Sequence, residues 1–360
     1  IITQLFLRRK IRILLIAFLC GLLLHSPVFS ENKSEHLNLS KVTMQVRWLH
    51  QFQFAGYYAA VHKGFYRERG LDVDIVAGSP EKQPVSEVLS GRAQYAEANT
   101  ELLHSYLNGE PLVALAAIVQ HSPSVLLARR DSGIRTPQDL IGKRVMMVGG
   151  TEDLDFLSML SKEGVKRSSL TITPSSYNIQ DLIDGKTDVF NAYLTNEPFY
   201  LKQNNIETIQ IRPVDYGVDF YSDILFTTKN EIENNPERVQ AFIEATILGW
   251  EYALKNKDEI IDLILNKYGQ RKSREHLKYE AESIEKLILP NLIPIGNINP
   301  GRFEKMANTL VDFGYAKPDF NIDDPFKTVN LEQYSVKNKI SFLETLAQKA
   351  EIFNNLHKQD

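Results

Sequence analysis

The chain has 360 residues, of which 43% are hydrophobic and 24% charged, and a formal net charge of −4. This composition is typical of a globular protein with a sizeable core and excludes a disordered chain. The mild negative charge, without a long basic run in the body of the chain, argues against nucleic acid as a partner.

The first thirty residues are typical of a secretory signal peptide. Arg8, Arg9 and Lys10 precede an apolar stretch over residues 13–24, and a small residue, Ser30, suits a signal-peptidase site. The apolar stretch is shorter than the roughly 20 residues that span a bilayer. We therefore expect a periplasmic or extracytoplasmic protein, exported by this signal and membrane-anchored only if the signal is not cleaved.

Beyond residue 40, strand-like runs alternate with helical patterns, which predicts an α/β fold with mainly parallel sheets. The run over residues 112–119 is continuously apolar, as expected of a strand buried on both faces. The expected strands are residues 44–48, 71–76, 94–98, 112–119, 124–129, 144–148, 187–192 and 223–228. The expected helices are residues 55–62, 100–107, 151–164, 178–184, 197–202, 235–254, 258–267 and 273–289.

The last thirty residues, 331–360, form a separate tail. Ile340, Leu343, Ala347 and Ala350 recur at heptad-like spacing, but the stripe is short. This pattern predicts either a terminal helix packed on the body or a linker helix leading to a further domain.

The sequence lacks the common signatures of catalysis and metal binding. The eight histidines show no paired metal-ligand spacing, and no phosphate-binding loop, dinucleotide-binding motif or nucleophile elbow is present. Cys20, the only cysteine, lies in the signal segment, so the exported part is expected to hold no disulfide and no thiolate site. We therefore expect a protein that is not an enzyme and that carries no metal and no cofactor.

Polar and aromatic residues cluster in loops that follow the predicted strands: "WLHQFQF", "EANT", "QHSP", "GGTED", "AYLTNEP" and "VDFYSD". Open α/β sheets bind ligands at the carboxyl ends of their strands. Some of these residues have structural explanations, because Asn99 and Thr151 can cap helices and Tyr58 can belong to the core. The candidate ligand-binding residues are Trp48, Gln51, Gln53, Tyr58, Asn99, Gln120, His121, Thr151, Tyr193, Asn196, Glu197, Asp219 and Tyr221.

A family resemblance rests on "WLHQFQF" followed by "AGYYAAVHKGFYRERGLDVDI". Together with "LLARRDSGIRTPQDLIGKRV", "DGKTDVFNAYLTNEPFYL", "VDYGVDFYSDILFTT" and "NPERVQAFIEATILGWEYAL", this stretch resembles the substrate-binding proteins grouped with the thiamine-pyrimidine synthases. The similarity covers roughly residues 42–313. It implies a type 2 periplasmic-binding-protein fold, in which two α/β lobes close on a small molecule.

The resemblance also implies how the chain divides between the lobes. We expect residues 41–129 and 228–330 to form the first lobe and residues 130–227 to form the second. The two crossings between lobes are then expected near residues 129–135 and 226–230.

By the same resemblance, the protein is expected to be the solute-binding component of an ABC-type importer, a monomer that delivers its ligand to a membrane permease. The ligand would be a small heteroaromatic molecule such as a thiamine pyrimidine precursor. Trp48 and Tyr58 would provide ring faces, and Glu197 would accept a hydrogen bond from an amino group. The amides of Gln51, Gln53 and Asn196 would match ring nitrogens and exocyclic groups, and Thr151 would meet a carbonyl or anionic oxygen.

Two alternatives remain at this stage. The segment "WLHQFQFAGYY" is also similar to segments of ligand-sensing ectodomains, whose partner would be a fused signalling domain. The synthase branch of the family is the remote alternative. Phe54 stands where the synthases have their reacting histidine, and His50 stands where they have the lysine that holds pyridoxal phosphate. Synthase activity is therefore not expected.

Overall fold

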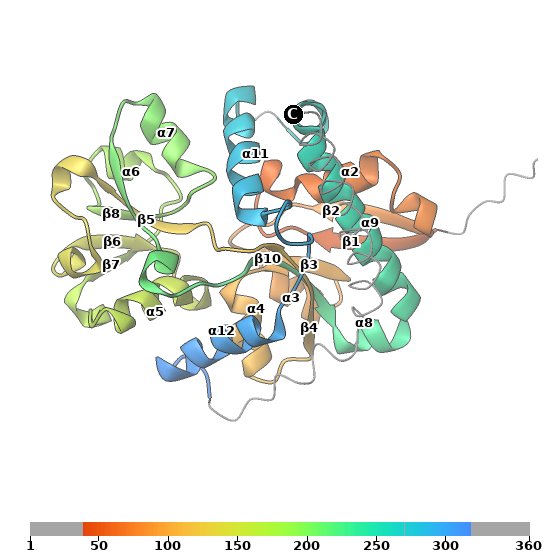
Figure 1. Ribbon diagram of the computed structural model, residues 1–360, viewed down its shortest axis with the longest axis horizontal. Helices are drawn as coiled ribbons and strands as arrows, with labels where there is room; N and C mark the ends of the chain where they lie inside the picture. The colour runs from red at the N-terminus through yellow and green to blue at the C-terminus, as the bar shows by residue number, and fades with distance from the viewer. Residues whose placement is uncertain (1–38, 270, 318–360) are drawn as a thin grey trace, which may run out of the picture. The chain divides into compact units, whose positions relative to one another are not determined.

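The computed structural model describes residues 39–269 and 271–317, which form two lobes, each built on a five-stranded sheet (Figure 1). This arrangement confirms the expected α/β class. The predicted signal segment, residues 1–30, and the tail from residue 331 lie outside the described residues.

The first sheet has the strand order β2-β1-β3-β10-β4. β1 is parallel to β2 and β3, whereas β10 is antiparallel to β3 and β4. Every residue of β4 is buried, as its apolar run predicted. The strands are β1 (Ser40–Gln45), β2 (Leu71–Val76), β3 (Tyr95–Ala98), β4 (Leu112–Val119) and β10 (Ser222–Thr228).

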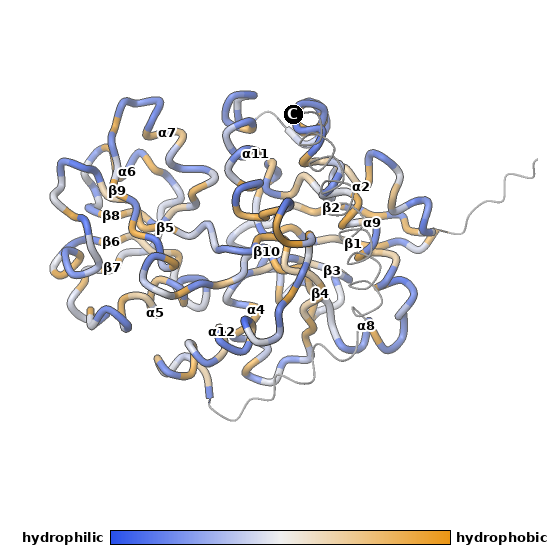
Figure 2. The backbone as a smooth tube through the Cα atoms, in the orientation of Figure 1, coloured by the Kyte–Doolittle hydropathy of each residue, from blue (hydrophilic) through white to orange (hydrophobic). Residues whose placement is uncertain are grey.

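Helices cover both faces of the first sheet, and the hydrophobic residues concentrate on the strands between them (Figure 2). One face packs against α2 (Ala55–His62), α9 (Pro236–Lys255), α10 (Lys257–Leu263) and α11 (Arg274–Ile288). The other face packs against α3 (Pro84–Leu89), α4 (Thr100–Leu107) and α12 (Pro300–Asp312). A short helix, α8 (Lys229–Asn234), joins β10 to α9.

The second sheet has the order β7-β6-β8-β5-β9. Its strands are β5 (Ser124–Arg129), β6 (Arg144–Met147), β7 (Thr171–Pro174), β8 (Val189–Tyr193) and β9 (Thr208–Ile211). One face packs against α5 (Leu154–Lys162), and the other packs against α6 (Gln180–Ile183) and α7 (Glu197–Gln203).

The chain crosses between the lobes twice, at residues 120–123 between β4 and β5 and at residues 212–221 between β9 and β10. The expected crossings at residues 129–135 and 226–230, and the lobe boundaries drawn from them, are therefore wrong. β5 pairs with β8 and β9 in the second sheet, and β10 pairs with β3 and β4 in the first. Both are apolar strands, and their composition does not indicate which sheet they join.

The first strand also differs from its prediction. It ends at Gln45, so Trp48 lies in the loop beyond the strand and not at its last residue. This loop is held against the segment after β2, where Gly78 N–H donates to the Trp48 carbonyl at 2.9 Å. Residue 78 must be glycine because a Cβ there would lie 2.5 Å from the Arg47 carbonyl. The close approach fixes the path of the loop.

Candidate functional site

A cavity of about 660 Å³ lies between the two lobes and is lined by residues of both. Much of its lining comes from the loops that follow β1, β2, β6, β7 and β8. These loops leave the carboxyl ends of parallel strands, where open α/β sheets bind ligands. The volume is within the range of small-molecule sites.

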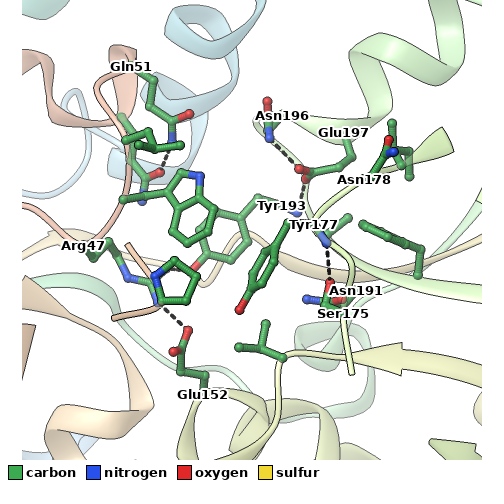
Figure 3. A pocket seen from close by; sticks show the side chains of 18 of the residues that line it. Arg47, Gln51, Glu152, Ser175, Tyr177, Asn178, Asn191, Tyr193, Asn196 and Glu197 are labelled. Atoms are coloured by element: carbon green, nitrogen blue, oxygen red, sulfur yellow. Dashed lines mark hydrogen bonds and ion pairs between the residues drawn. The ribbon is translucent and has the colours of Figure 1, made fainter. Parts of the chain in front are cut away.

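Aromatic side chains from both lobes form one wall of the cavity. The rings of Trp48 and Tyr177 lie 5.0 Å apart at an angle of 33°. Trp48 follows β1 in the first lobe, whereas Tyr177 follows β7 in the second lobe and is 48% exposed. Tyr193, at the end of β8, also lines the cavity and lies beside Tyr177 in Figure 3. The two lobes must therefore come together to complete this wall.

Arg47 occupies one end of the cavity, where it meets acidic residues. Its guanidinium contacts the Tyr193 hydroxyl and lies 3.4 Å from Glu152 and 3.6 Å from Glu101 (Figure 3). Burial raises the pKa of Glu152 to about 6, although the charge of Arg47 opposes this shift. This end of the cavity carries more carboxylates than cations.

The opposite end of the cavity is lined by amide groups that are joined in a chain of hydrogen bonds. Lys272 donates to Gln51 Oε1 at 2.6 Å and to Asn196 Oδ1 at 2.7 Å. Gln51 Nε2 donates to Gln53 Oε1 at 2.6 Å. We call the six linked residues the amide chain: Asp223, Gln53, Gln51, Lys272, Asn196 and Glu197.

Both ends of the amide chain are carboxylates. Gln53 Nε2 donates to Asp223 Oδ1 at 2.8 Å, and Asn196 Nδ2 donates to Glu197 Oε1. Glu197 Oε2 also accepts from the backbone N–H of Tyr193 at 2.8 Å. Burial raises the pKa of Glu197 above its ordinary value and raises that of Asp223 to about 6.

Six of the thirteen residues predicted from the sequence line this cavity, and they come from both lobes. They are Trp48, Gln51, Gln53, Tyr193, Asn196 and Glu197. The other seven lie elsewhere, for three separate reasons.

Tyr58 belongs to the core, which is the alternative that the sequence left open. Its ring is fully buried and stacks on Tyr268 with a centroid distance of 4.1 Å. Its hydroxyl lies 2.9 Å from Nδ1 of His50, which does line the cavity. Tyr58 therefore supports the wall from behind.

Asn99 and Thr151 hold the lobes together behind the cavity wall. Asn99 makes no capping hydrogen bond; its Oδ1 accepts from the Ser222 hydroxyl at 2.8 Å, and its amide donates to the Tyr193 hydroxyl. The Thr151 carbonyl accepts from the Thr100 hydroxyl of the first lobe at 2.8 Å. Neither residue lines the cavity.

The remaining four predicted residues lie at the two crossings between the lobes. His121 Nδ1 lies 2.7 Å from Asp219, and Arg302 donates to Asp219 at 3.0 Å and to the Gln120 carbonyl. The Arg302 guanidinium also lies 4.1 Å from the centre of the Tyr221 ring. We call these five residues the hinge cluster, and their position explains why polar residues occur there away from the cavity.

Sequence reasoning missed several residues of the wall. Tyr177 follows β7, a strand that the sequence did not predict, and Glu152 lies in the "GGTED" loop after the expected strand β6. Arg47 lies beside Trp48, and its acidic partners Glu101 and Glu152 are far from it in the sequence. Lys272 precedes α11, where no strand ends, so no sequence signal could have identified it.

The described residues show no cluster of three or more histidine, cysteine, aspartate or glutamate side chains that could hold a metal ion. Among the helices of residues 39–269 and 271–317, none is both long enough and apolar enough to cross a bilayer. The aromatic wall and the amide chain suit the cavity to a polar, partly aromatic small molecule, held by stacking and hydrogen bonds.

Solved structures with the same architecture define the class of this fold. The periplasmic aliphatic sulphonate-binding protein SsuA from Escherichia coli superposes with a TM-score of 0.61 at 14% identity, covering 80% of this chain and 91% of that protein. The nitrate-binding protein NrtA from Synechocystis PCC 6803 gives a TM-score of 0.59 at 14% identity, covering 79% and 84%. The fold is thus that of the type 2 periplasmic binding proteins, as the resemblance implied.

The sequence assigns the chain to a family within this class. The family described as NMT1/THI5 like matches residues 51–260, and the chain belongs to it. A formylaminopyrimidine-binding protein from Halalkalibacterium halodurans is 23% identical over 324 residues, covering 88% of this chain and 98% of the relative. The riboflavin-binding protein RibY from Chloroflexus aurantiacus is 24% identical, covering 67% and 70%. A 4-amino-5-hydroxymethyl-2-methylpyrimidine phosphate synthase from Legionella pneumophila is also 24% identical, covering 62% and 73%.

Proposed function

We propose that this protein is an extracytoplasmic solute-binding protein that holds a flat, nitrogen-containing heteroaromatic ligand between its lobes and delivers it to a membrane permease. The observation that carries the proposal is that one cavity has two different walls. One wall is aromatic and contains Trp48 and Tyr177, and the other consists of amides and carboxylates. Rings stack on the aromatic wall, and ring nitrogens and exocyclic groups pair with the polar wall. The relatives named for binding formylaminopyrimidine and riboflavin support the same ligand class.

Two side chains of the cavity wall each carry a buried polar atom without a protein partner among the described residues. The side-chain oxygen of Asn191, a lining residue, has no hydrogen-bond partner within the described residues, and neither does Nε of Arg47. Buried polar groups are normally paired.

The residues at the two positions that the synthases use for catalysis, Phe54 and His50 in this chain, fit a binding role and not catalysis. Phe54, directly before α2, is fully buried in the core, so no imidazole is present there. His50 lines the cavity, but it offers no amine for a covalent link to a cofactor. These two positions favour the binding branch of the family.

The proposal is tested by a thermal-shift screen followed by calorimetry. The panel contains formylaminopyrimidine, 4-amino-5-hydroxymethyl-2-methylpyrimidine and riboflavin, with alkanesulfonates and nitrate as anionic comparisons. A ligand at 100 times its Kd should stabilise the protein by about 2.7 kcal/mol. Stabilisation by a heteroaromatic compound that is lost in Trp48→Ala is the expected result.

Stabilisation by sulfonates or nitrate alone would contradict the proposed ligand class. Genes for a permease and an ATPase beside this one would support transport. A reading frame that continues into a kinase or cyclase domain would instead support a sensor with the same cavity.

A further inference from the structure

Lys272 uses all of its hydrogen-bonding capacity inside the protein. Its ammonium group has three N–H donors and meets three acceptors, Gln51 Oε1, Asn196 Oδ1 and the Glu280 carboxylate. The side chain is only 13% exposed, and that of Glu280 is 2% exposed. Glu280 also accepts the backbone N–H of Phe52 at 3.0 Å. Lys272 is therefore not a free cation waiting for an anionic ligand.

The ammonium group fixes the orientation of the amide groups in the first arm of the amide chain, which runs from Lys272 through Gln51 and Gln53 to Asp223. An ammonium group donates and cannot accept, so the Gln51 amide must turn its oxygen to Lys272 and its NH2 group to Gln53. Gln53 must then accept with its oxygen and donate with its NH2 group, which it does to Asp223. An amide between neutral partners could adopt either orientation, and here neither amide can.

The second arm, from Lys272 through Asn196 to Glu197, is fixed in the same way. Asn196 turns its oxygen to Lys272, so its NH2 group faces Glu197. After these bonds, Gln51 and Asn196 each retain one N–H that is not used in the chain, and each oxygen of Glu197 retains a lone pair. Figure 3 shows Gln51, Asn196 and Glu197 at the same end of the cavity, opposite Glu152.

We propose that Lys272 is a positioning residue that fixes the direction of the amide chain and so determines which ligand edge this wall accepts. The favoured edge places an acceptor, such as a ring nitrogen, against the spare amide N–H groups and an amino group against Glu197. An oxo group in place of the amino group would meet the Glu197 carboxylate, lone pair against lone pair. The inference rests on the proposed function and deepens it, because it specifies the ligand as an amino-substituted heteroaromatic.

Lys272 also couples this selectivity to closure of the lobes. Asn196 belongs to the second lobe, whereas Lys272, Gln51 and Glu280 belong to the first. Two further contacts join the same segments. The Tyr279 hydroxyl donates to the Leu194 carbonyl at 2.9 Å, and His276 stacks on Phe199 with a centroid distance of 4.4 Å. The direction of the second arm is therefore set only when the lobes are closed.

The first test compares two probes, 4-amino-2-methylpyrimidine and 2-methylpyrimidin-4-one, by calorimetry. We expect the wild type to prefer the amino compound by about tenfold or more, because the oxo compound sets its oxygen lone pairs against the Glu197 carboxylate where the amino compound donates to it. Lys272→Met should reduce this ratio to about threefold or less, since the amides become free to turn. Lys272→Arg, which keeps the donors, should restore most of the preference.

Removing Lys272 leaves the buried Glu280 carboxylate without its cationic partner, which could prevent folding. The double variant Lys272→Met with Glu280→Gln avoids this, because glutamine still offers an oxygen to the Phe52 N–H. Lys278→Met, on the exposed face of α11, is the matched control and should keep the wild-type ratio. A folded double variant that also keeps the wild-type ratio would overturn the proposal, because a purely structural loss weakens both probes alike.

The second test needs no ligand. Cysteines introduced for spin labels at Gln203 on α7 and Glu282 on α11, with Cys20 replaced by serine, report the distance between the lobes. Lys272→Met should broaden and lengthen this distance relative to the wild type, and Lys278→Met should not. A distance in Lys272→Met equal to that of the wild type would overturn the link to closure. If the wild type binds neither probe, the proposed function is contradicted. The spin-label distances would still test whether Lys272 holds the two lobes together.

Discussion

Glu197 is the carboxylate on which recognition of a ligand amino group depends. Its two oxygens already accept from Asn196 and from the Tyr193 N–H, and burial keeps water from competing for them. A charge-assisted hydrogen bond contributes about 1.5–3 kcal/mol. Glu197→Gln should therefore weaken binding of an aminopyrimidine by about tenfold or more, measured by calorimetry. Glu233→Gln, on an exposed residue of α8, is the control, and unchanged affinity in Glu197→Gln would remove this residue from the site.

Asp223 should make the stability of the protein depend on pH. Its backbone φ is 47°, its side chain is fully buried, and one of its oxygens has no partner among the described residues. Burial raises its pKa from an ordinary 3.8 to about 6. Because the folded state holds the proton more tightly than the unfolded state, the contribution of this group to stability is full below about pH 4 and is lost as the pH rises to about 6.

Asp223→Asn should remove this dependence. Asparagine tolerates the left-handed backbone and keeps an oxygen for Gln53, while its NH2 group replaces the unpaired oxygen. We expect the variant to be more stable than the wild type at pH 8, by up to about 3 kcal/mol, and equal to it near pH 4. Urea denaturation from pH 4 to pH 8 measures the difference, with the exposed Asp312→Asn as control. A constant difference over this range would show that Asp223 does not titrate there.

Single residues of the site could be predicted from the sequence only where they directly follow a predicted strand. Tyr193, Asn196 and Glu197 follow a predicted strand directly, and the structure places all three in the cavity wall. Lys272 reaches the same wall from 221 positions beyond Gln51, through the packing of α11 on the first lobe. Such a contact depends on tertiary structure that composition and spacing do not encode.

Among the elements, α2 and α9 pack unusually closely because glycines face each other. A Cβ on Gly249 would lie 2.1 Å from the Gly56 carbonyl oxygen and 2.8 Å from the Cβ of Ala60. Gly249→Ala should therefore separate the helices and reduce the free energy of unfolding by about 1–3 kcal/mol. Gly301→Ala in α12, where a Cβ comes no closer than 3.4 Å to Asn299, should be neutral or slightly stabilising. Equal effects of the two changes, measured by urea denaturation, would contradict this explanation.

The two crossings show why elements are easier to predict than their partners. The ranges of β5 and β10 were predicted to within a residue, because their apolar runs and flanking turns mark them. Their sheets were assigned wrongly, because β5 is antiparallel to β8 and β9, which follow it by about sixty residues or more. Strand pairing over such separations is decided by the global topology and not by local sequence.

At the scale of the whole molecule, the hinge cluster should govern how fast the lobes move and not what they bind. Asp219 links His121 on one crossing to Arg302 on α12, at a distance from the cavity lining. Asp219→Asn should change the rates of ligand association and dissociation, by up to about tenfold, while keeping the ratio of the affinities for amino and oxo pyrimidines. Stopped-flow fluorescence of Trp48 measures these rates, since Trp250, the other tryptophan, is fully buried.

Asp215→Asn, an exposed change on the same crossing, provides the comparison and should leave the rates unchanged. A loss of discrimination in Asp219→Asn would show that the hinge and the cavity are not separable. Rates equal to those of the wild type would show that the cluster does not control closure.

The amide chain has a consequence for how this family can change its ligand. Because a donor-only cation stands in the middle and a carboxylate at each end, no single amide in the chain can be reversed while its neighbours remain. A change of preference from an amino to an oxo ring edge therefore requires Lys272 and the residues beside it to be replaced as a group. In relatives with another ligand, we expect Gln51, Gln53, Lys272 and Asn196 to be either all kept or all replaced. Ligand preference in this family would then change through several linked substitutions and not through independent single ones.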